Sequence, residues 1–227
     1  MYFDPMYLVF MAPALLLAFY AQMKVRGAYN TYTKVANSRG LTGLDAARVI
    51  LGPEGLGHVQ VEDTPGQLTD HYDPRSKKLR LSAGVAQQPS IAALAIVAHE
   101  IGHALQDNQN YAPLKLRGAI VPAVSVSAWV APILFFAGLL LGLTQLAWVG
   151  VILFGASVLF ALVTLPVEFD ASKRALRLLQ SYNLADGREL KGAKAVLDAA
   201  ALTYVAALAQ TLATLLYYVS FLGRQRD

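Results

Sequence analysis

Two histidines placed four residues apart are the clearest chemical signal in the sequence. They belong to His99-Glu100-Ile101-Gly102-His103, which has the form H-E-x-x-H. On a helix, residues i and i+4 share one face, so both imidazoles can bind the same Zn²⁺. Zinc lowers the pKa of a bound water toward ~7, and Glu100 can accept the proton of that water. The motif therefore predicts a hydrolytic zinc site with Glu100 as general base. The alternative is a pair of hydrogen-bonded core histidines.

A catalytic zinc usually has three protein ligands, so a third is expected elsewhere in the chain. The metzincin spacing would need glycine at 106 and histidine at 109, but the chain has Gln106 and Gln109. We expect Glu168 to be the ligand, because it is the first charge after 50 uncharged residues. A carboxylate at that position is costly unless it is paired or bound to metal. The alternative role of Glu168 is a favourable charge at the start of a helix.

Four other residues are weaker ligand candidates. Asp170 is expected beside the site rather than on the metal, or paired with Arg174 four residues later. His58 and His71 lie on or near predicted strands and are expected to be surface or core histidines. Asp186 lies in a polar turn, which makes it a poor ligand.

Charged residues are absent from three long stretches, although the chain as a whole is 15% charged and 56% hydrophobic. The stretches are Pro5–Met23, Gly118–Val167 and Ala199–Gly223, with 19, 50 and 25 residues. A bilayer core about 30 Å thick needs roughly 20 apolar helical residues. We therefore predict a retained N-terminal anchor rather than a signal peptide, and a hairpin of two membrane helices. The third stretch is expected either to span the membrane or to pack against that hairpin.

The remaining residues predict a small domain that contains both helices and strands. A hairpin of strands Leu68–Tyr72 and Lys78–Ser82 precedes a helix from Ile91 to about Gln106, and an amphipathic helix is expected at Val167–Ser181. The fold class is thus mainly α and membrane-bound, with transmembrane helices and a small α+β zincin-like cytoplasmic domain. The expected segments are an N-terminal anchor at 1–23, a catalytic part at 24–118, a membrane hairpin at 119–166, cytoplasmic helices with the third ligand at 167–198, and an apolar helix at 199–227.

Basic residues are concentrated in the two long polar segments. Gln22–Arg117 contains 11 and Val167–Asp198 contains 6. The positive-inside rule places both segments on the cytoplasmic side of a bacterial inner membrane, with Arg224 and Arg226 in mild conflict if the last helix spans. The chain has no cysteine, which excludes disulfides and thiolate ligands, and its net charge of +4 is not clustered as a nucleic-acid partner would require.

Four separated blocks of sequence, in order, resemble one known family. They begin with His71-Tyr-Asp-Pro-Arg-Ser-Lys77 and His99-Glu-Ile-Gly-His-Ala-Leu-Gln106, and continue with Leu165-Pro-Val-Glu-Phe-Asp-Ala-Ser-Lys-Arg-Ala175 and Asp198-Ala-Ala-Ala-Leu-Thr-Tyr-Val205. The chain resembles the "putative neutral zinc metallopeptidases" of bacterial membranes, the YugP-like family, and is more distantly similar to the HtpX-like and CAAX-prenyl proteases. The resemblance implies a gluzincin-like zinc endopeptidase with Glu168 as third ligand. It also implies that Ser172 replaces a carboxylate found beside the metal in the distant relatives.

The expected reaction is hydrolysis of a protein or peptide substrate near the cytoplasmic face of the lipid bilayer. The second oxyanion donor is expected to be Tyr204, or else His71 or Tyr72. The alternative for Tyr204 is a plain core residue. The strand with Leu79, Arg80 and Leu81 is expected to bind substrate if it is an exposed edge; the alternative is an interior strand. Cleavage within the bilayer is a variant of this reaction. The competing function is a non-catalytic zinc-binding membrane scaffold or adaptor, which would have no need of Glu100.

Overall fold

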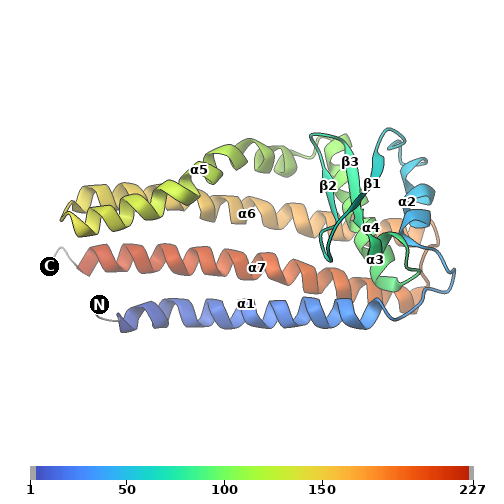
Figure 1. Cartoon of the computed structure of the whole chain (residues 1–227), viewed down its shortest axis with the longest axis horizontal. Coiled ribbons are helices and arrows are strands. Elements are labelled where there is room, and N and C mark those ends of the chain that lie inside the picture. The colour runs from blue at the N-terminus through green and yellow to red at the C-terminus, as the bar shows by residue number, and fades with distance from the viewer. Residues whose placement is uncertain (1–3, 225–227) are drawn as a thin grey trace. The chain divides into compact units, whose positions relative to one another are not determined.

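A computed structural model describes residues 4–224 as a mainly helical chain with one small mixed sheet (Figure 1). The described residues do not include 1–3, at the start of the predicted first segment, or 225–227, at the end of the predicted last segment. Arg226 is among the residues left out. The helices are α1 (Pro5–Tyr32), α2 (Gly43–Leu51), α3 (Ala83–Ala86), α4 (Ile91–Asn108), α5 (Ala112–Leu140), α6 (Thr144–Ser181) and α7 (Gly187–Arg224), and the strands are β1 (Gln60–Thr64), β2 (His71–Asp73) and β3 (Lys78–Ser82).

The chain divides into two compact units, which are described separately below. We call residues 1–21, 115–165 and 203–227 the apolar unit, and residues 22–114 and 166–202 the mixed unit. The helices α1, α5, α6 and α7 each contribute residues to both units. These four are also the described helices that are long and apolar enough to cross a membrane.

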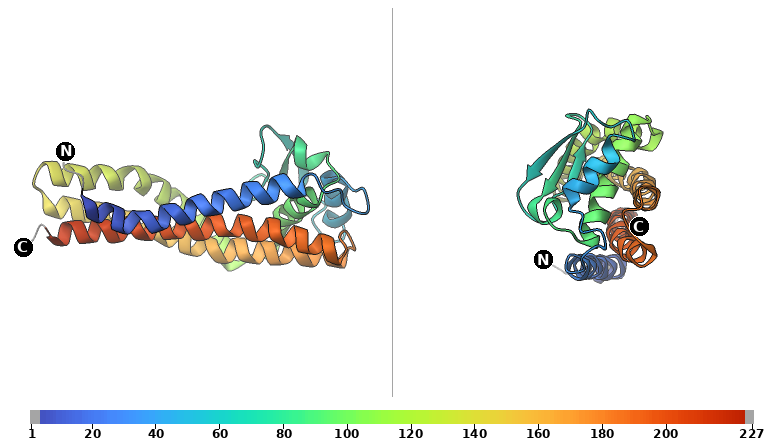
Figure 2. Two further views of the ribbon diagram at one scale, coloured as in Figure 1. Left: turned by 90° about the horizontal axis from the view of Figure 1, so that it is seen from below. Right: turned by 90° about the vertical axis from the view of Figure 1, so that its right-hand side faces the viewer.

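Two pairs of neighbouring helices form the apolar unit. The helices α1 and α7 run side by side, and α5 and α6 form a hairpin (Figures 1 and 2). The hairpin turns at Gly142, whose φ of +66° favours glycine. Glycines also allow α5 and α6 to pack closely, because a Cβ on Gly138 would meet the backbone nitrogen of Ala147 at 2.4 Å, and one on Gly150 would meet that of Phe135 at 2.6 Å. The predicted membrane hairpin is thus present as a helical hairpin.

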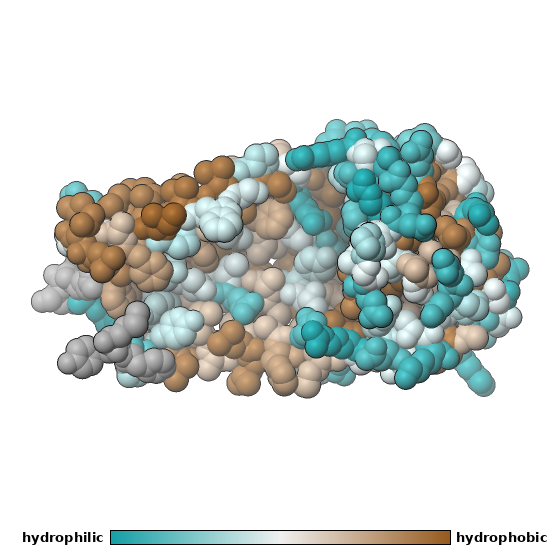
Figure 3. All heavy atoms as spheres, viewed as in Figure 1, coloured by the Kyte–Doolittle hydropathy of each residue, from teal (hydrophilic) through white to brown (hydrophobic). Residues whose placement is uncertain are grey.

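The surface of the apolar unit is rich in exposed hydrophobic side chains. Trp129 is 79% exposed, Ile152 is 73% exposed and Leu140 is 86% exposed. Figure 3 shows hydrophobic residues over the helices of this unit and hydrophilic residues over the mixed unit. Such a surface is unfavourable in water and suits a lipid environment.

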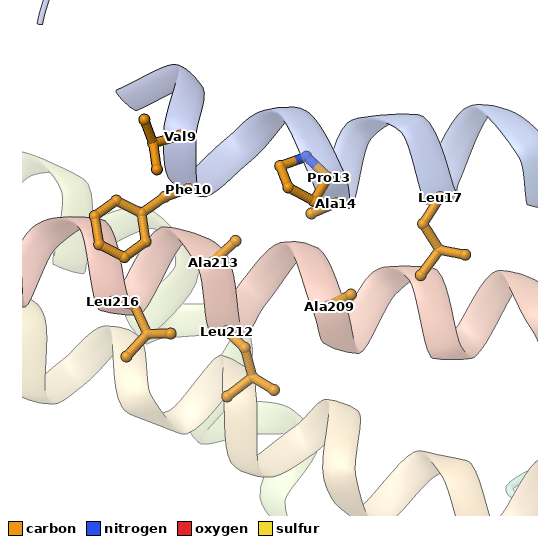
Figure 4. Close-up of a pocket in the computed structure, with 9 residues that line it drawn as sticks. All are labelled: Val9, Phe10, Pro13, Ala14, Leu17, Ala209, Leu212, Ala213 and Leu216. Atoms are coloured by element: carbon orange, nitrogen blue, oxygen red, sulfur yellow. The ribbon is translucent and has the colours of Figure 1, made fainter. Parts of the chain in front are cut away.

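A groove of about 340 Å³ lies between α1 and α7 in the apolar unit (Figure 4). It is lined by Val9, Phe10, Pro13, Ala14, Leu17, Ala209, Leu212, Ala213 and Leu216. These side chains have no nitrogen or oxygen atom outside the proline ring. The groove therefore offers no metal ligand and no group for acid–base chemistry.

The sheet of the mixed unit has the order β1-β3-β2. The strands β2 and β3 form the predicted antiparallel hairpin, in which Tyr72 is opposite Leu79, and β1 pairs with β3 in parallel. The strand β3 is therefore central, and the expectation that it is an exposed edge is wrong. The side chains of Leu79 and Leu81 are fully buried, and Arg80 forms ion pairs with Glu62 and Asp73.

The helix α4 forms the centre of the mixed unit, where it packs against α2, α3 and the sheet. Its first turn is capped by the Ser90 hydroxyl, which accepts a hydrogen bond from the Ala93 N–H at 3.1 Å. A capping box of Thr42 and Asp45 is likewise present at the start of α2. The fully buried Leu94 and Ile101 place α4 in the core, so the motif lies on a rigid element.

The helix α6 continues without interruption through Pro166. The prediction that a separate helix begins at Val167 is wrong, although the amphipathic stretch itself is helical as far as Ser181. Glu168 therefore lies inside a helix of 38 residues. The helix-start alternative for Glu168 fails for the same reason, since the dipole effect acts only in the first turn.

Candidate metal centre

Three side chains from two helices of the mixed unit come together at one point. His99 and His103 belong to α4, and Glu168 belongs to α6. Their candidate ligand atoms all lie within 4.8 Å of one another. Among the described residues, these three side chains form a group that could hold a metal ion. The Nε2 atoms of His99 and His103 lie 3.3 Å and 3.5 Å from Glu168 Oε2. The three predicted ligands thus form a cluster that could hold a metal ion.

The glycine inside the motif allows the two helices to meet closely enough for this cluster. A Cβ on Gly102 would lie 2.7 Å from the Ala171 carbonyl oxygen and 3.2 Å from the Ala171 Cα. Both residues are fully buried, and Ala171 has the smallest chiral side chain. A larger residue at either position would push α6 away from α4, and with it the Glu168 carboxylate.

The cluster favours a cation between its three side chains. Glu168 is only 2% exposed, and this burial alone would raise its pKa, but hydrogen bonds from His103 and His99 hold the pKa of Glu168 well below its usual range. Burial would likewise lower the pKa of His103, yet the contact with Glu168 and the charge of Glu100 raise that pKa overall. A carboxylate buried against two imidazoles therefore attracts either a proton or a metal ion.

Glu100 is fixed by the backbone of the neighbouring strand. Its Oε2 atom accepts a hydrogen bond from the Tyr72 N–H of β2 at 2.9 Å. The Tyr72 hydroxyl in turn donates to Asp107 Oδ2 on α4 at 2.7 Å, and this contact together with burial raises the pKa of Tyr72. Because Glu100 has another carboxylate oxygen, one oxygen can be held in place while the other accepts a proton.

The second ring nitrogen of each histidine also has a neighbour. His99 Nδ1 lies 3.3 Å from the Ser172 hydroxyl. His103 Nδ1 lies 3.0 Å from Gln106 Oε1. The Gln106 amide then donates to Asp170 Oδ2 at 2.9 Å. Asp170 is thus outside the cluster and reaches His103 only through Gln106. This position agrees with the prediction that Asp170 lies beside the site rather than on the metal.

The remaining predicted residues lie elsewhere. His71 is exposed on β2, where its Nε2 is 3.3 Å from Arg80 Nη1, and the Tyr72 hydroxyl is engaged by Asp107. Tyr204 lies on α7 in the apolar unit, and its role stays a prediction. His58 is exposed, and Asp186 caps α7 by accepting from the Glu189 N–H at 2.8 Å.

Sequence reasoning did not find the Tyr72 N–H or the role of Gln106. A backbone N–H has no sequence signature, because every residue except proline has one. Gln106 is a polar residue at 0% exposure within the predicted helix. A polar side chain three residues after a ligand histidine was the available signal.

The comparisons with known proteins agree with this cluster. Residues 7–223 match the model of a family described as "Putative neutral zinc metallopeptidase". The chain belongs to this family. It is also 46% identical over 214 residues to "Putative membrane protease YugP" of Bacillus subtilis (strain 168), which covers 94% of this chain and 95% of that protein. No solved structure matches the chain.

The family match extends over both units, because the matched range includes nearly the whole of the four apolar helices and all three cluster residues. The resemblance that the motif blocks predicted is therefore confirmed. The family description also names zinc, a metal for which two imidazoles and one carboxylate form a common catalytic ligand set.

Proposed function

We propose that the chain is a membrane-embedded zinc endopeptidase that hydrolyses peptide bonds of protein substrates near the cytoplasmic membrane face. The observation that supports this most strongly is the cluster of His99, His103 and Glu168 within 4.8 Å, with Glu100 fixed beside it. A site that only stores zinc or stabilises a fold has no need of a free carboxylate next to the ligands. The fixed Glu100 therefore favours an enzyme over a scaffold.

The residues present fit a catalytic zinc ion. Structural zinc sites usually have four protein ligands, whereas catalytic sites have three and keep one position open. Among the described residues, the cluster offers three. When bound by His99, His103 and Glu168, zinc would supply an acidified water and polarise the scissile carbonyl.

Glu100 is the proposed general base and acid. The Tyr72 N–H holds Oε2 in place, which leaves the other carboxylate oxygen of Glu100 to accept a proton. The same carboxyl group then returns the proton to the leaving amine, which would otherwise depart as an unstable anion. Tyr204 is the proposed second donor to the oxyanion.

The membrane topology follows from the charges at the ends of the four apolar helices. Four spans with both large polar segments in the cytoplasm place both chain ends outside, where the positive-inside rule disfavours Arg224. Arg224 is however paired with Asp4, at 2.8 Å between Nη2 and Oδ2. This pairing reduces the conflict, and we propose the cytoplasmic side of the bacterial inner membrane for the mixed unit.

The experiment compares the wild-type chain with Glu100→Gln after purification in detergent. Both proteins are analysed for zinc and assayed on an unfolded protein such as casein. We expect both to retain zinc, because Glu100 is not a ligand, and we expect hydrolysis to fall at least 100-fold in the variant.

Asp107→Asn provides a control, since Asp107 contacts Tyr72 but does not reach the cluster. Its activity should stay within a few-fold of the wild type. Equal hydrolysis by the wild type and Glu100→Gln would refute the mechanism. Zinc binding without any hydrolysis by the wild type would instead support the non-catalytic scaffold.

A further inference from the structure

Gln106 contacts His103 of the metal cluster and, on α6, the residue next to Glu168, although it is not itself a member of the cluster. It lies on α4 three residues after His103 and is 0% exposed. Its Nε2 atom donates to the Val167 carbonyl at 2.8 Å and to Asp170 Oδ2 at 2.9 Å. Val167 precedes Glu168 directly, so this amide is attached to α6 at the position of the third ligand.

The orientation of the Gln106 amide follows from its partners. A backbone carbonyl can only accept hydrogen bonds, so the NH₂ group must face Val167. The same group also faces Asp170 Oδ2, which accepts a further hydrogen bond from Arg174 Nε. The carbonyl oxygen of Gln106 must then face His103 Nδ1, at 3.0 Å.

This orientation determines which nitrogen of His103 has the proton. Gln106 Oε1 can only accept, so Nδ1 of His103 must donate and the neutral ring has its lone pair on Nε2. Nε2 is the atom that lies 3.5 Å from Glu168 Oε2, inside the metal cluster. The opposite tautomer would place two acceptors against each other in a buried site, which costs free energy.

His99 lacks this arrangement. Its Nδ1 lies 3.3 Å from the Ser172 hydroxyl, which can rotate and either donate or accept. The hydroxyl is therefore compatible with both tautomers of His99. The two histidines differ in this respect, and only His103 has a partner that selects one tautomer.

We propose that Gln106 is a positioning residue, which fixes His103 in the Nδ1–H tautomer and holds α6 at Val167, so that Nε2 and the Glu168 carboxylate face the same metal ion. This inference rests on the proposed zinc site. It assigns Gln106 a role through His103 and Val167, without contact to metal or substrate.

The experiment measures zinc affinity of the detergent-purified chain by competition with a chromogenic chelator. Gln106→Leu removes both hydrogen-bonding ends at similar size, and we expect zinc to bind 10–100-fold more weakly. The matched control is Gln180→Leu, the same change at an exposed position on α6, which should bind zinc as the wild type does.

A comparison of two single variants separates positioning from simple folding. Gln106→Glu keeps an acceptor oxygen for His103 Nδ1–H but cannot donate to Val167 or Asp170, whereas Gln106→Leu removes both functions. We expect Gln106→Glu to keep the proton of His103 on Nδ1 and Gln106→Leu to lose this preference, and a thermal melt verifies that both variants fold. The same mixture of tautomers in both variants would overturn the proposal.

The tautomer is read directly by ¹⁵N NMR of histidine-labelled protein, which is practical because the chain has four histidines. We expect His103 to have its proton on Nδ1 in the wild type and a mixture of tautomers in Gln106→Leu. Unchanged tautomer and unchanged zinc affinity in Gln106→Leu would contradict the inference. A wild type that binds no zinc would instead contradict the proposed function.

Discussion

The mixed unit has a continuous core that includes α2, the sheet, α4 and the parts of α6 and α7 that belong to this unit, whereas the hydrophobic cluster described in the apolar unit contains four buried residues. In water, burial of apolar surface drives such a core to form. In lipid the surroundings are as apolar as leucine, so helices associate mainly through close contacts of small residues. Gly138 and Gly150 in the apolar unit fit this second mode.

The comparison shows where a precise site can be built. The ligands of the cluster are held by α4, which lies in the core of the mixed unit, and by the part of α6 that packs on it. A catalytic arrangement needs its ligands fixed to about 0.5 Å. We therefore expect substitutions in the two units to differ strongly in their effect on stability and on zinc.

The largest difference is expected for apolar truncations. Leu94→Ala removes a side chain that is 1% exposed in the core of the mixed unit, and we expect a loss of about 2–5 kcal/mol in the free energy of unfolding. Ile152→Ala in the apolar unit truncates a side chain that is 73% exposed, and we expect a change within about 0.5 kcal/mol. Denaturant unfolding in detergent measures both, and equal losses would break the comparison.

An intermediate effect is expected for Gly102→Ala. The added methyl group would lie 2.7 Å from the Ala171 carbonyl, so α6 must shift, at a cost of about 1–3 kcal/mol in stability. Zinc should also bind more weakly, because Glu168 moves with α6. Gly155→Ala on α6 is the control, because a Cβ added there would meet no other atom within 4 Å. Wild-type zinc affinity and stability in Gly102→Ala would show that close packing of the two helices is not required.

The smallest effect is expected for Arg224→Ala in the apolar unit. Arg224 forms an ion pair with Asp4, and the two side chains are 46% and 23% exposed. Exposed ion pairs contribute about 0–1 kcal/mol to the free energy of unfolding. We expect a loss of stability in that range which diminishes as salt is added. A loss above 2 kcal/mol, measured in the same unfolding experiment, would show that this pair holds α1 and α7 together.

The sequence predicted the three ligands because each had a local signal. His99 and His103 are four residues apart on a helix, and Glu168 follows the longest uncharged stretch. The turn at Gly142 and the cap at Ser90 were predictable for the same reason, since both depend on the chemistry of one or two residues.

The errors concern interactions between distant segments. The position of β3 between β1 and β2 depends on a parallel pairing that no local pattern reveals, and so the expected edge was wrong. The helix expected to start at Val167 directly follows Pro166, and proline usually breaks a helix in water, but helices near a membrane tolerate proline and α6 continues through it. In the sequence, Gln106 indicated only that the metzincin spacing of ligands is absent. Its positioning role was not predictable, because its partners Val167 and Asp170 lie about 60 residues away in the chain.

The most direct test of the metal centre is the zinc content of Glu168→Gln beside the wild type, both purified without chelator and analysed by mass spectrometry. Glutamine keeps the size of the buried side chain but replaces the carboxylate with a poor zinc ligand, and a thermal melt verifies that the variant folds. We predict about one zinc ion per wild-type chain and at least a tenfold loss in the variant. Equal zinc content in the two proteins would contradict the assignment of Glu168 as the third ligand.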